Sequence, residues 1–366
     1  MTSSRAPLPS GNGARLSCLA LERKAKLTIL YTLVIAALFG WVMDRLRVPG
    51  GMMIGAVIGA CGFNILSGGA QMPAEAKIAA QIVAGAFIGS GIKREDIKQM
   101  KAILKAAAIV ISCLFAVNLT AAVLIRATGP VDFLTALFAS APGGLSDIPI
   151  IAADMGADAS QVLALQFVRF VMGIAIFPSL IARFTPRQRE DEGPEASKKQ
   201  AAGGSLSDTL LTLAVAAAFG LAGRASPVPG GTMAFATIGA IIFKLLYPKA
   251  WLGRPVRKGA QLLSGAYVGA GIGLAQLVQL KHLALPVVML LLSYSVGAVL
   301  IAALLQRLRI FGRREAFLAA TPAGASDMAL ISADLGVYNV KLVLLQVMRL
   351  IAVILLFPSI FWMLAK

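Results

Sequence analysis

The sequence predicts an all-α polytopic membrane protein made of two inverted repeats of about five transmembrane helices, each with a re-entrant or broken helix hairpin. Three observations predict this fold class. The chain is very apolar, its second half repeats the first at an offset of 180 residues, and the basic residues of equivalent loops alternate in opposite phase. Together they indicate a chain that crosses a bilayer many times in two related units.

The composition is typical of a chain surrounded by lipid. Of the 366 residues, 58% are hydrophobic and 14% are charged, and the mean hydropathy is +0.81. In soluble domains about a quarter of the residues are charged. Apolar runs such as 27–43 and 102–125 are long enough to cross a hydrocarbon core of about 30 Å. The lipid bilayer is therefore the first expected partner.

The formal net charge of +17 does not indicate nucleic-acid binding. Most Lys and Arg lie in short loops between apolar runs, as the positive-inside rule requires, and no stretch forms a basic recognition helix. We expect no nucleic-acid partner. His282 is the only histidine and the three cysteines are scattered, so we expect no metal site of the His or Cys type and no cofactor.

The internal repeat is visible at every landmark of the two halves. The segment APGGLSDIPIIAADMG stands opposite TPAGASDMALISADLG, and the same offset aligns the other motifs without a gap. The matched ranges are 48–51 with 228–231, 81–92 with 261–272, 141–156 with 321–336, and 165–179 with 345–359. The sequence therefore predicts a duplicated unit.

These landmarks divide the chain into four parts. We expect a polar, basic and unfolded N-terminal tail at 1–26, membrane repeat 1 at 27–182, a polar linker at 183–206 and membrane repeat 2 at 207–366. The linker is rich in Pro, Gly and charge, as suits a tether. The expected spans are 27–43, 51–66, 76–92, 102–126 and 160–182 in repeat 1, and 207–223, 231–247, 259–275, 283–305 and 340–364 in repeat 2.

A broken element lies between the fourth and fifth span of each repeat. In repeat 1 its apolar arms are 133–140 and 148–155, each too short to cross a bilayer. Two short arms around APGGLSD predict a hairpin that enters the membrane and returns on the same side, although a crossing broken helix is an alternative. Such backbone is tolerated at depth only where protein or a watery cavity surrounds it.

A returning hairpin leaves five crossings per repeat, so the two repeats must be inverted. The loop charges agree, because loops rich in Lys and Arg in one repeat are poor in them in the other. This pattern predicts a multi-pass protein of the bacterial inner membrane with the linker 183–206 in the cytoplasm. The basic tail is then placed outside, against the rule. The basic residues assigned to the outer loops and the C-terminus are Lys77, Arg126, Arg224, Lys281 and Lys366.

Helices that stop inside a membrane are where secondary transporters bind solutes and ions. A helix end leaves N–H or C=O groups without partners, and these groups and the helix dipole can bind a ligand. Gly143, Gly144 and Gly324 allow a tight turn and close approach of a ligand to the backbone. Pro142 and Pro322 prevent the helix from continuing. The repeated stretch is therefore the candidate binding site.

Two pairs of aspartates follow these turns. Asp147 and Asp327 are expected as N-caps of the second arm, a role worth about 1 kcal/mol, or as ligands of a proton or ion. Ser146 and Ser326 stand beside them and supply hydroxyl ligands or complete the turn. A weaker candidate pair, seven residues on, is Asp154 and Asp334. These lie on the same helix face or at the membrane surface.

The fifth span of each repeat carries a Gln and an Arg three residues apart, which places them on one helix face. They are Gln166 with Arg169 and Gln346 with Arg349. An arginine inside a span avoids lipid, so it either pairs with the aspartate of its own repeat or binds an anionic solute through its guanidinium fork. Both interpretations are open.

The duplicated PGG-SD, AAD-G and LQ-VR motifs resemble the AbrB-duplication membrane proteins, and the resemblance covers the chain beyond residue 26. Members of that family are bacterial inner-membrane proteins that carry labels such as ammonia monooxygenase or AbrB-type regulator. More loosely, the chain is similar to inverted-repeat secondary transporters, which include cation–proton antiporters and anion symporters. It lacks the paired Asp-Asp or Asn-Asp that cation antiporters carry within one span. Relatives of this kind imply a homodimer.

The first functional hypothesis is a secondary transporter of a small anionic solute, coupled to H⁺ or Na⁺, with the site between the two hairpins. The second is a membrane protein that regulates gene expression indirectly, since no soluble effector segment is visible. The third is an enzyme such as a monooxygenase, which needs several His or Cys ligands. An all-carboxylate site from Asp147 and Asp327 is its only candidate. We expect no enzyme.

Overall fold

The chain is helical throughout the part that the structure describes. The computed structural model describes residues 11–91, 100–143, 145, 148–184, 205–226, 231–335, 337 and 340–365. Every regular element within these ranges is a helix. The all-α prediction is therefore confirmed for the described residues.

The helices follow the predicted order in both repeats. Repeat 1 contains α1 (Gly11–Arg45), α2 (Gly51–Ser67), α3 (Ala74–Ser90), α5 (Met100–Thr128), α6 (Phe133–Ser140), α7 (Ile148–Asp154), α8 (Ala159–Val171), the π-helical turn η1 (Met172–Ile176) and α9 (Phe177–Phe184). Repeat 2 contains α11 (Leu206–Ala225), α12 (Gly231–Leu246), α13 (Arg254–Ala270), α14 (Leu274–His282), α15 (Ala284–Arg307), α16 (Arg313–Ala320), α17 (Ala325–Asp334) and α18 (Val340–Ala365).

Two boundaries differ from the prediction. α1 begins at Gly11, so residues 11–26 are helical rather than an unfolded tail. This segment has no Pro, and after Gly13 it is rich in Ala, Leu, Arg and Lys, which favour helices. The expected span 259–275 is interrupted in the structure, because α13 ends at Ala270 and α14 continues at an angle of 67°. Asn64 of α2 binds the freed carbonyls of Ala270 (2.9 Å) and Ile272 (3.1 Å) at this bend.

Several helices suit a membrane. In the described chain, five stretches are long and apolar enough to cross a bilayer: Arg23–Arg45, Ile103–Thr128, Ala159–Ile181, Leu206–Ala225 and Ala284–Arg307. The bent pair α13 and α14 makes a sixth. α2 and α12 are apolar but have only 17 and 16 residues. The protein is thus a polytopic membrane protein by its helices, and the ten expected spans are confirmed in part.

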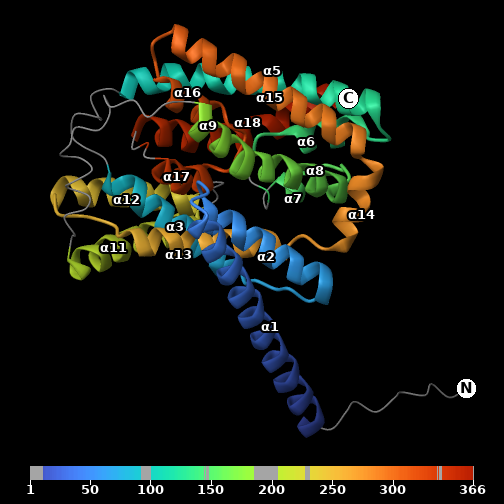
Figure 1. Cartoon of the computed structure of the whole chain (residues 1–366), viewed down its shortest axis with the longest axis vertical. Coiled ribbons are helices and arrows are strands. Elements are labelled where there is room, and N and C mark those ends of the chain that lie inside the picture. The colour runs from blue at the N-terminus through green and yellow to red at the C-terminus, as the bar shows by residue number, and fades with distance from the viewer. Residues whose placement is uncertain are drawn as a thin grey trace, which may run out of the picture.

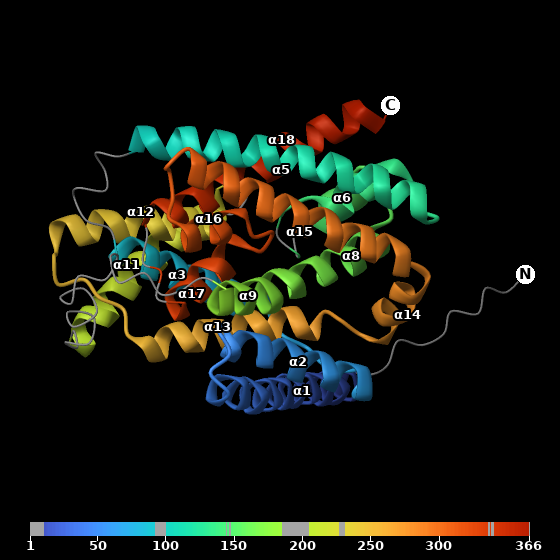
Figure 2. The ribbon, with the colours of Figure 1, turned by 45° about the horizontal axis from the view of Figure 1, so that its top comes forward.

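The helices form two layers (Figures 1 and 2). One layer, here called the interlocked layer, consists of α1, α2, α3, α11, α12 and α13. The other, the hairpin layer, contains α5 to α9 and α15 to α18, with the long helices α5 and α15 side by side on its outer face. The hairpins α6–α7 and α16–α17 lie between those long helices and the interlocked layer.

The interlocked layer is built by exchange between the repeats. α3 of repeat 1 packs against α11 and α12 of repeat 2, and α13 of repeat 2 packs in return against α1 and α2. The contacts of α3 with α12 and of α13 with α2 involve equivalent residues of the two repeats. A Cβ atom on Gly85 would lie 2.7 Å from the Cβ of Ala236, and one on Gly265 would lie 2.8 Å from the Cβ of Ala56. The 180-residue offset relates these two contacts, so the repeats meet in a reciprocal manner.

The largest apolar core lies mainly in the hairpin layer. It surrounds α6, whose Phe138 packs edge to face against Phe361 of α18, with ring centroids 5.2 Å apart. On the outside, α15 exposes Leu292, Val296 and Leu300 at a spacing of four residues. This apolar stripe faces outward, as expected of a helix in contact with lipid.

The close glycine contacts predict a sharp difference between two substitutions in α13. Gly269→Ala would place a Cβ 2.5 Å from the carbonyl oxygen of Val57, whereas a Cβ on Gly259 meets no atom within 4 Å. Overpacking of this kind costs about 1–3 kcal/mol, and alanine in an open helical position gains about 0.5–1 kcal/mol over glycine. Thermal unfolding of the purified protein should show a lower Tm for Gly269→Ala and an unchanged or higher Tm for Gly259→Ala. Equal values for the two variants would contradict the reciprocal packing.

Candidate functional site

Both hairpins break where the sequence predicts. α6 starts at its N-cap Asp132, which accepts a hydrogen bond from the N–H of Thr135 (2.9 Å), and ends at Ser140 before Ala141 and Pro142. α16 ends at Ala320, before Thr321 and Pro322. Proline lacks the N–H that a further turn needs. Gly144, Ser146 and Asp147 lie outside the described residues, and Ser326 is described only by its backbone in α17.

Glycine is required at one position of each loop. A Cβ atom on Gly143 would lie 2.6 Å from Cγ1 of Ile148, and one on Gly324 would lie 2.5 Å from a carboxylate oxygen of Asp327. A larger residue there would force the side chain of Ile148 or Asp327 to move. The glycines therefore leave room for these side chains of the second arm beside the turn.

Arg169 joins the two hairpins. Its guanidinium is buried and donates to the carbonyl of Gly143 (2.8 Å), to the carbonyl of Pro322 in the other repeat, and to Oε1 of Gln166. Gln166 in turn donates from Nε2 to the carbonyls of Phe138 (2.8 Å) and Ala141 (3.0 Å). These two side chains satisfy carbonyls that the end of α6 leaves without helical partners.

Arg349 plays a similar part in repeat 2, but on its own hairpin only. It donates to the carbonyls of Ala319 (3.3 Å), Thr321 (2.8 Å) and Ala323 (2.7 Å). Both arginines thus bind main-chain carbonyls, and among the described residues neither pairs with an aspartate. Their assignment as solute ligands stays a prediction.

Gln346 breaks the symmetry of this arrangement. It is 1% exposed, yet neither its Nε2 nor its Oε1 has a partner among the described residues. Its equivalent Gln166 is fully paired through Nε2 and accepts from Arg169. The glutamine at this position thus supports the hairpin loop in repeat 1 and makes no such contact in repeat 2.

Two residues of the long helices complete the support of α6. Asn118 of α5 donates to the carbonyl of Leu137 (3.1 Å) and to the hydroxyl of Ser140 (2.9 Å). Tyr294 of α15 donates its hydroxyl to the carbonyl of Ser140. The side chains of Asn118, Ser140 and Tyr294 are all buried. The end of α6 is therefore fixed from α5, α15 and α8.

Asp327 lies in the first turn of α17, two residues inside the helix, rather than at the N-cap as expected. A Cβ atom on Gly324 would lie too close to this carboxylate, so glycine suits the start of α17. The Asp327 side chain is 7% exposed and accepts a hydrogen bond from the hydroxyl of Ser264 on α13 (2.8 Å). It faces a cavity of about 50 Å³ rather than lipid.

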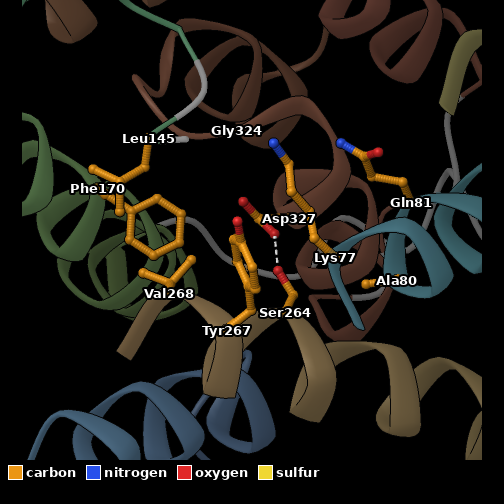
Figure 3. Close-up of a pocket in the computed structure, with 10 residues that line it drawn as sticks. All are labelled: Lys77, Ala80, Gln81, Leu145, Phe170, Ser264, Tyr267, Val268, Gly324 and Asp327. Atoms are coloured by element: carbon orange, nitrogen blue, oxygen red, sulfur yellow. Dashed lines mark hydrogen bonds between the residues drawn. The ribbon is translucent and has the colours of Figure 1, made fainter. Parts of the chain in front are cut away.

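This cavity lies between the two layers (Figure 3). α3 contributes Lys77 and Gln81, and α13 contributes Ser264 and Tyr267. In Figure 3, Lys77 and Tyr267 extend toward Asp327 from two sides. Leu145, Phe170 and Val268 form its apolar wall. The cavity thus contains a cation, a carboxylate, an amide and two hydroxyls within an otherwise apolar protein.

The sequence prediction missed most of these residues. Lys77, assigned above to an outer loop, stands in the first turn of α3 and lines the cavity. A signal for two positions existed, because Lys77 and Gln81 stand opposite Arg257 and Gln261 at the 180-residue offset. Ser264 and Tyr267 have no polar equivalent in repeat 1, where Ala84 and Phe87 stand. Their role follows only from the packing of α13 against α17.

Asp334 and Asp154 have different surroundings. Asp334, at the end of α17, binds Nη2 of Arg257 (2.6 Å) and Nε2 of Gln261 (2.8 Å), and so ties this hairpin to α13. Asp154, its equivalent at the end of α7, is exposed and has no partner among the described residues. Neither lines the cavity beside Asp327.

A larger open cavity of about 600 Å³ adjoins the first. It is lined by α1, the loop 70–73, α7, α8 and the end of α13, and it shares Leu145, Tyr267 and Val268 with the small cavity. We call it the vestibule. These three side chains are all that the two cavities have in common, so they separate the polar cavity from the open space beside α7.

The comparison with known proteins follows the duplication. Residues 4–185 and residues 174–365 each match one family model, which is described as transition state regulatory protein AbrB. The chain belongs to the AbrB family. Its two matches confirm the duplication and the family resemblance. A protein of Bacillus subtilis (strain 168), described as uncharacterized protein YhjN, is 23% identical over 354 residues, which cover 90% of this chain and 91% of that protein.

The position of Arg169 predicts a large loss of stability on replacement by lysine. An ammonium group cannot bind both hairpin loops and Gln166 with the geometry of a guanidinium fork. At least one buried carbonyl then lacks a donor, which costs about 1–3 kcal/mol. Arg169→Lys should lower the Tm in detergent by several degrees. Arg183→Lys, on the exposed end of α9, is the matched control and should leave it unchanged; equal Tm values would show that the bridge contributes nothing.

Proposed function

We propose that this AbrB-family protein is a secondary transporter of a small anionic solute, coupled to H⁺ or Na⁺. The observation that carries the proposal is the polar cavity around Asp327, which lies between helices of both repeats and beside the open vestibule. Buried ionisable groups in membrane proteins are costly and tend to mark ion and solute pathways. The proposal is of a transporter rather than an enzyme.

The architecture supports this proposal. The reciprocal packing of α3 with α12 and of α13 with α2 is the pattern that a pseudo-two-fold between the repeats would produce, and the opposite charge phase of the loops argues that the repeats are inverted in the membrane. The two hairpins are then re-entrant elements that reach the middle of the bilayer from opposite sides. The linker lies in the cytoplasm and the protein in a bacterial inner membrane, where a homodimer is its proposed assembly.

The chemistry of the cavity supports a small anion. Lys77 supplies a full positive charge, and the N-terminal end of α17, at Gly324 and Asp327, adds the partial positive charge of a helix start. A cavity of about 50 Å³ favours a solute of only a few heavy atoms, since a single water needs about 10–15 Å³ of volume measured in this way.

Asp327 supports coupling to a cation. A carboxylate with two hydroxyls nearby, from Ser264 and Tyr267, provides oxygen ligands for Na⁺ or an acceptor for a proton. Either cation would offset the negative charge of Asp327 when an anion enters beside Lys77. Binding of the anion and binding of the cation are thereby linked, which is the requirement for symport.

The family model is described as a transition state regulatory protein, which supports a second candidate function. In that role the protein would act on gene expression through a partner or through the solute it moves. Asp327→Asn separates the two candidates in cells. Loss of solute flux with intact regulation favours transport, and the reverse result favours a regulatory membrane protein.

Ligand-dependent stabilisation tests the transporter. The purified protein is heated with a panel of small carboxylates and inorganic anions, with and without Na⁺ and at several pH values. A solute at about 100 times its Kd adds about 2.7 kcal/mol of stability, so the Tm should rise by several degrees. Lys77→Gln and Asp327→Asn should abolish the rise. Asp44→Asn, a carboxylate in the interlocked layer that pairs with Lys258, should retain it.

Flux into proteoliposomes completes the test. The solute that stabilises the protein should accumulate when a gradient of H⁺ or Na⁺ is imposed, and Asp327→Asn should lose the accumulation. If no anion or cation stabilises the wild-type protein, or if Asp327→Asn responds as the wild type does, the proposed site is wrong.

A further inference from the structure

The two hairpins are alike in sequence but differ in their surroundings. α17 packs against α3 and α13 of the interlocked layer, whereas α7 packs mainly against α6, α8 and α18. The vestibule adjoins the first hairpin through Leu145 and Pro149. One hairpin is therefore docked on the interlocked layer, and the other lies beside open space.

The docked hairpin is held by three residues whose equivalents exist in the other repeat. Asp334 binds Arg257 and Gln261. At the 180-residue offset the chain places Asp154, Lys77 and Gln81. An acid, a base and an amide thus stand on the matching helices α7 and α3. Asp154 is exposed and has no partner among the described residues, so α7 and α3 do not form the equivalent ion pair.

The side chains that bind the two hairpin loops also differ between the repeats. Gln166 binds two carbonyls of its hairpin, while Gln346 is buried without a partner. An unpaired buried amide costs free energy. Arg169 reaches across to Pro322, while Arg349 stays on its own loop. Exchange of the two arrangements would pair Gln346 with the carbonyls at 318 and 321 and would let Arg349 reach Pro142.

We infer that the protein has a second state in which the hairpins exchange places. In that state α7 docks on the interlocked layer, Asp154 pairs with Lys77 and Gln81, and the vestibule opens beside α17 instead. This inference deepens the proposed transport function and rests on it, because the exchange presents the site to alternate sides of the membrane. The contacts between acid, base and amide are equivalent in the two states and are made by the opposite repeat.

The exchange assigns a double role to two basic residues. In the state described here Lys77 lines the polar cavity and Arg257 locks the docked hairpin. In the second state Lys77 becomes the lock on Asp154, and Arg257, released from Asp334, takes the role that Lys77 has in the present state. In each state, the basic residue that lines the cavity in the other state is engaged in the ion pair instead. The anion then loses this partner, which favours its release on the new side.

Crosslinking of cysteine pairs tests the second state. Cys18, Cys61 and Cys113 are first replaced by Ser in the full-length chain. One variant then carries Gln261→Cys with Asp334→Cys, and the other carries Gln81→Cys with Asp154→Cys. Membranes are treated with a short bis-methanethiosulfonate crosslinker, and linked peptides are identified by mass spectrometry. Both pairs should crosslink. A crosslink of the first pair alone overturns the inference.

A second measurement does not depend on those pairs. Met72→Cys places a thiol in the vestibule, where maleimide modifies it in the present state. Asp334→Asn removes the lock of this state, so modification in membranes should slow by up to roughly fivefold, the factor that about 1 kcal/mol represents. Asp154→Asn should not slow it, and the control Asp44→Asn should leave it unchanged. Equal rates for Asp334→Asn and the control also overturn the inference.

The outcomes separate this inference from the proposed function. If both crosslinks form but no tested anion or cation crosses the membrane, the two states stand and the transport proposal fails. If the protein carries a solute while only the Gln261 and Asp334 pair crosslinks, transport stands and the exchange of hairpins is wrong.

Discussion

The structure depends on one constraint, which is the need to satisfy backbone carbonyls where helices stop inside an apolar protein. α6 and α16 end at the buried residues Ser140 and Ala320, where solvent does not reach the carbonyls that a helix end leaves unpaired. The carbonyls beyond these ends are bound by Gln166, Arg169 and Arg349. A guanidinium offers five donors and no acceptor, so it can serve several carbonyls at once. The cost of burying two arginines is offset by the carbonyls that they satisfy.

This constraint also explains how the polar cavity is positioned. Because Arg169 binds Gly143 of one loop and Pro322 of the other, the two turns are fixed relative to each other. The first turn of α17 then places Asp327 against Ser264 of the interlocked layer. The arginines act on the site through the backbone, and the groups that face the cavity come from α3, α13 and α17.

Much of the fold was predictable because local sequence patterns determine where its helices begin and end. The arms 133–140 and 148–155 match α6 (Phe133–Ser140) and α7 (Ile148–Asp154) closely, since a Pro-Gly break between short apolar runs fixes both ends. The boundary between α13 and α14 was missed, because the apolar pattern continues through the bend and the partner that stabilises it, Asn64, comes from the other repeat.

The site was predicted less well than the fold, for a similar reason. The repeated motif identified the turns and Asp327, which local sequence makes conspicuous. It did not identify Lys77, Gln81, Ser264 and Tyr267, because these residues reach the cavity only through the exchange of α3 and α13 between repeats. Contacts between segments nearly 200 residues apart leave no mark on local periodicity, and only the matched pairs of Lys77 with Arg257 and Gln81 with Gln261 offered a hint.

The exchange of α3 and α13 has a consequence for how the chain is made. During synthesis α3 leaves the ribosome more than a hundred residues before α12, against which its Gly85 and Gly89 pack. Until then, repeat 1 holds a helix with a lysine and a glutamine on its surface and no protein to cover them. The packing of α3 can therefore be completed only late in synthesis, when α11 and α12 of the second half have entered the bilayer.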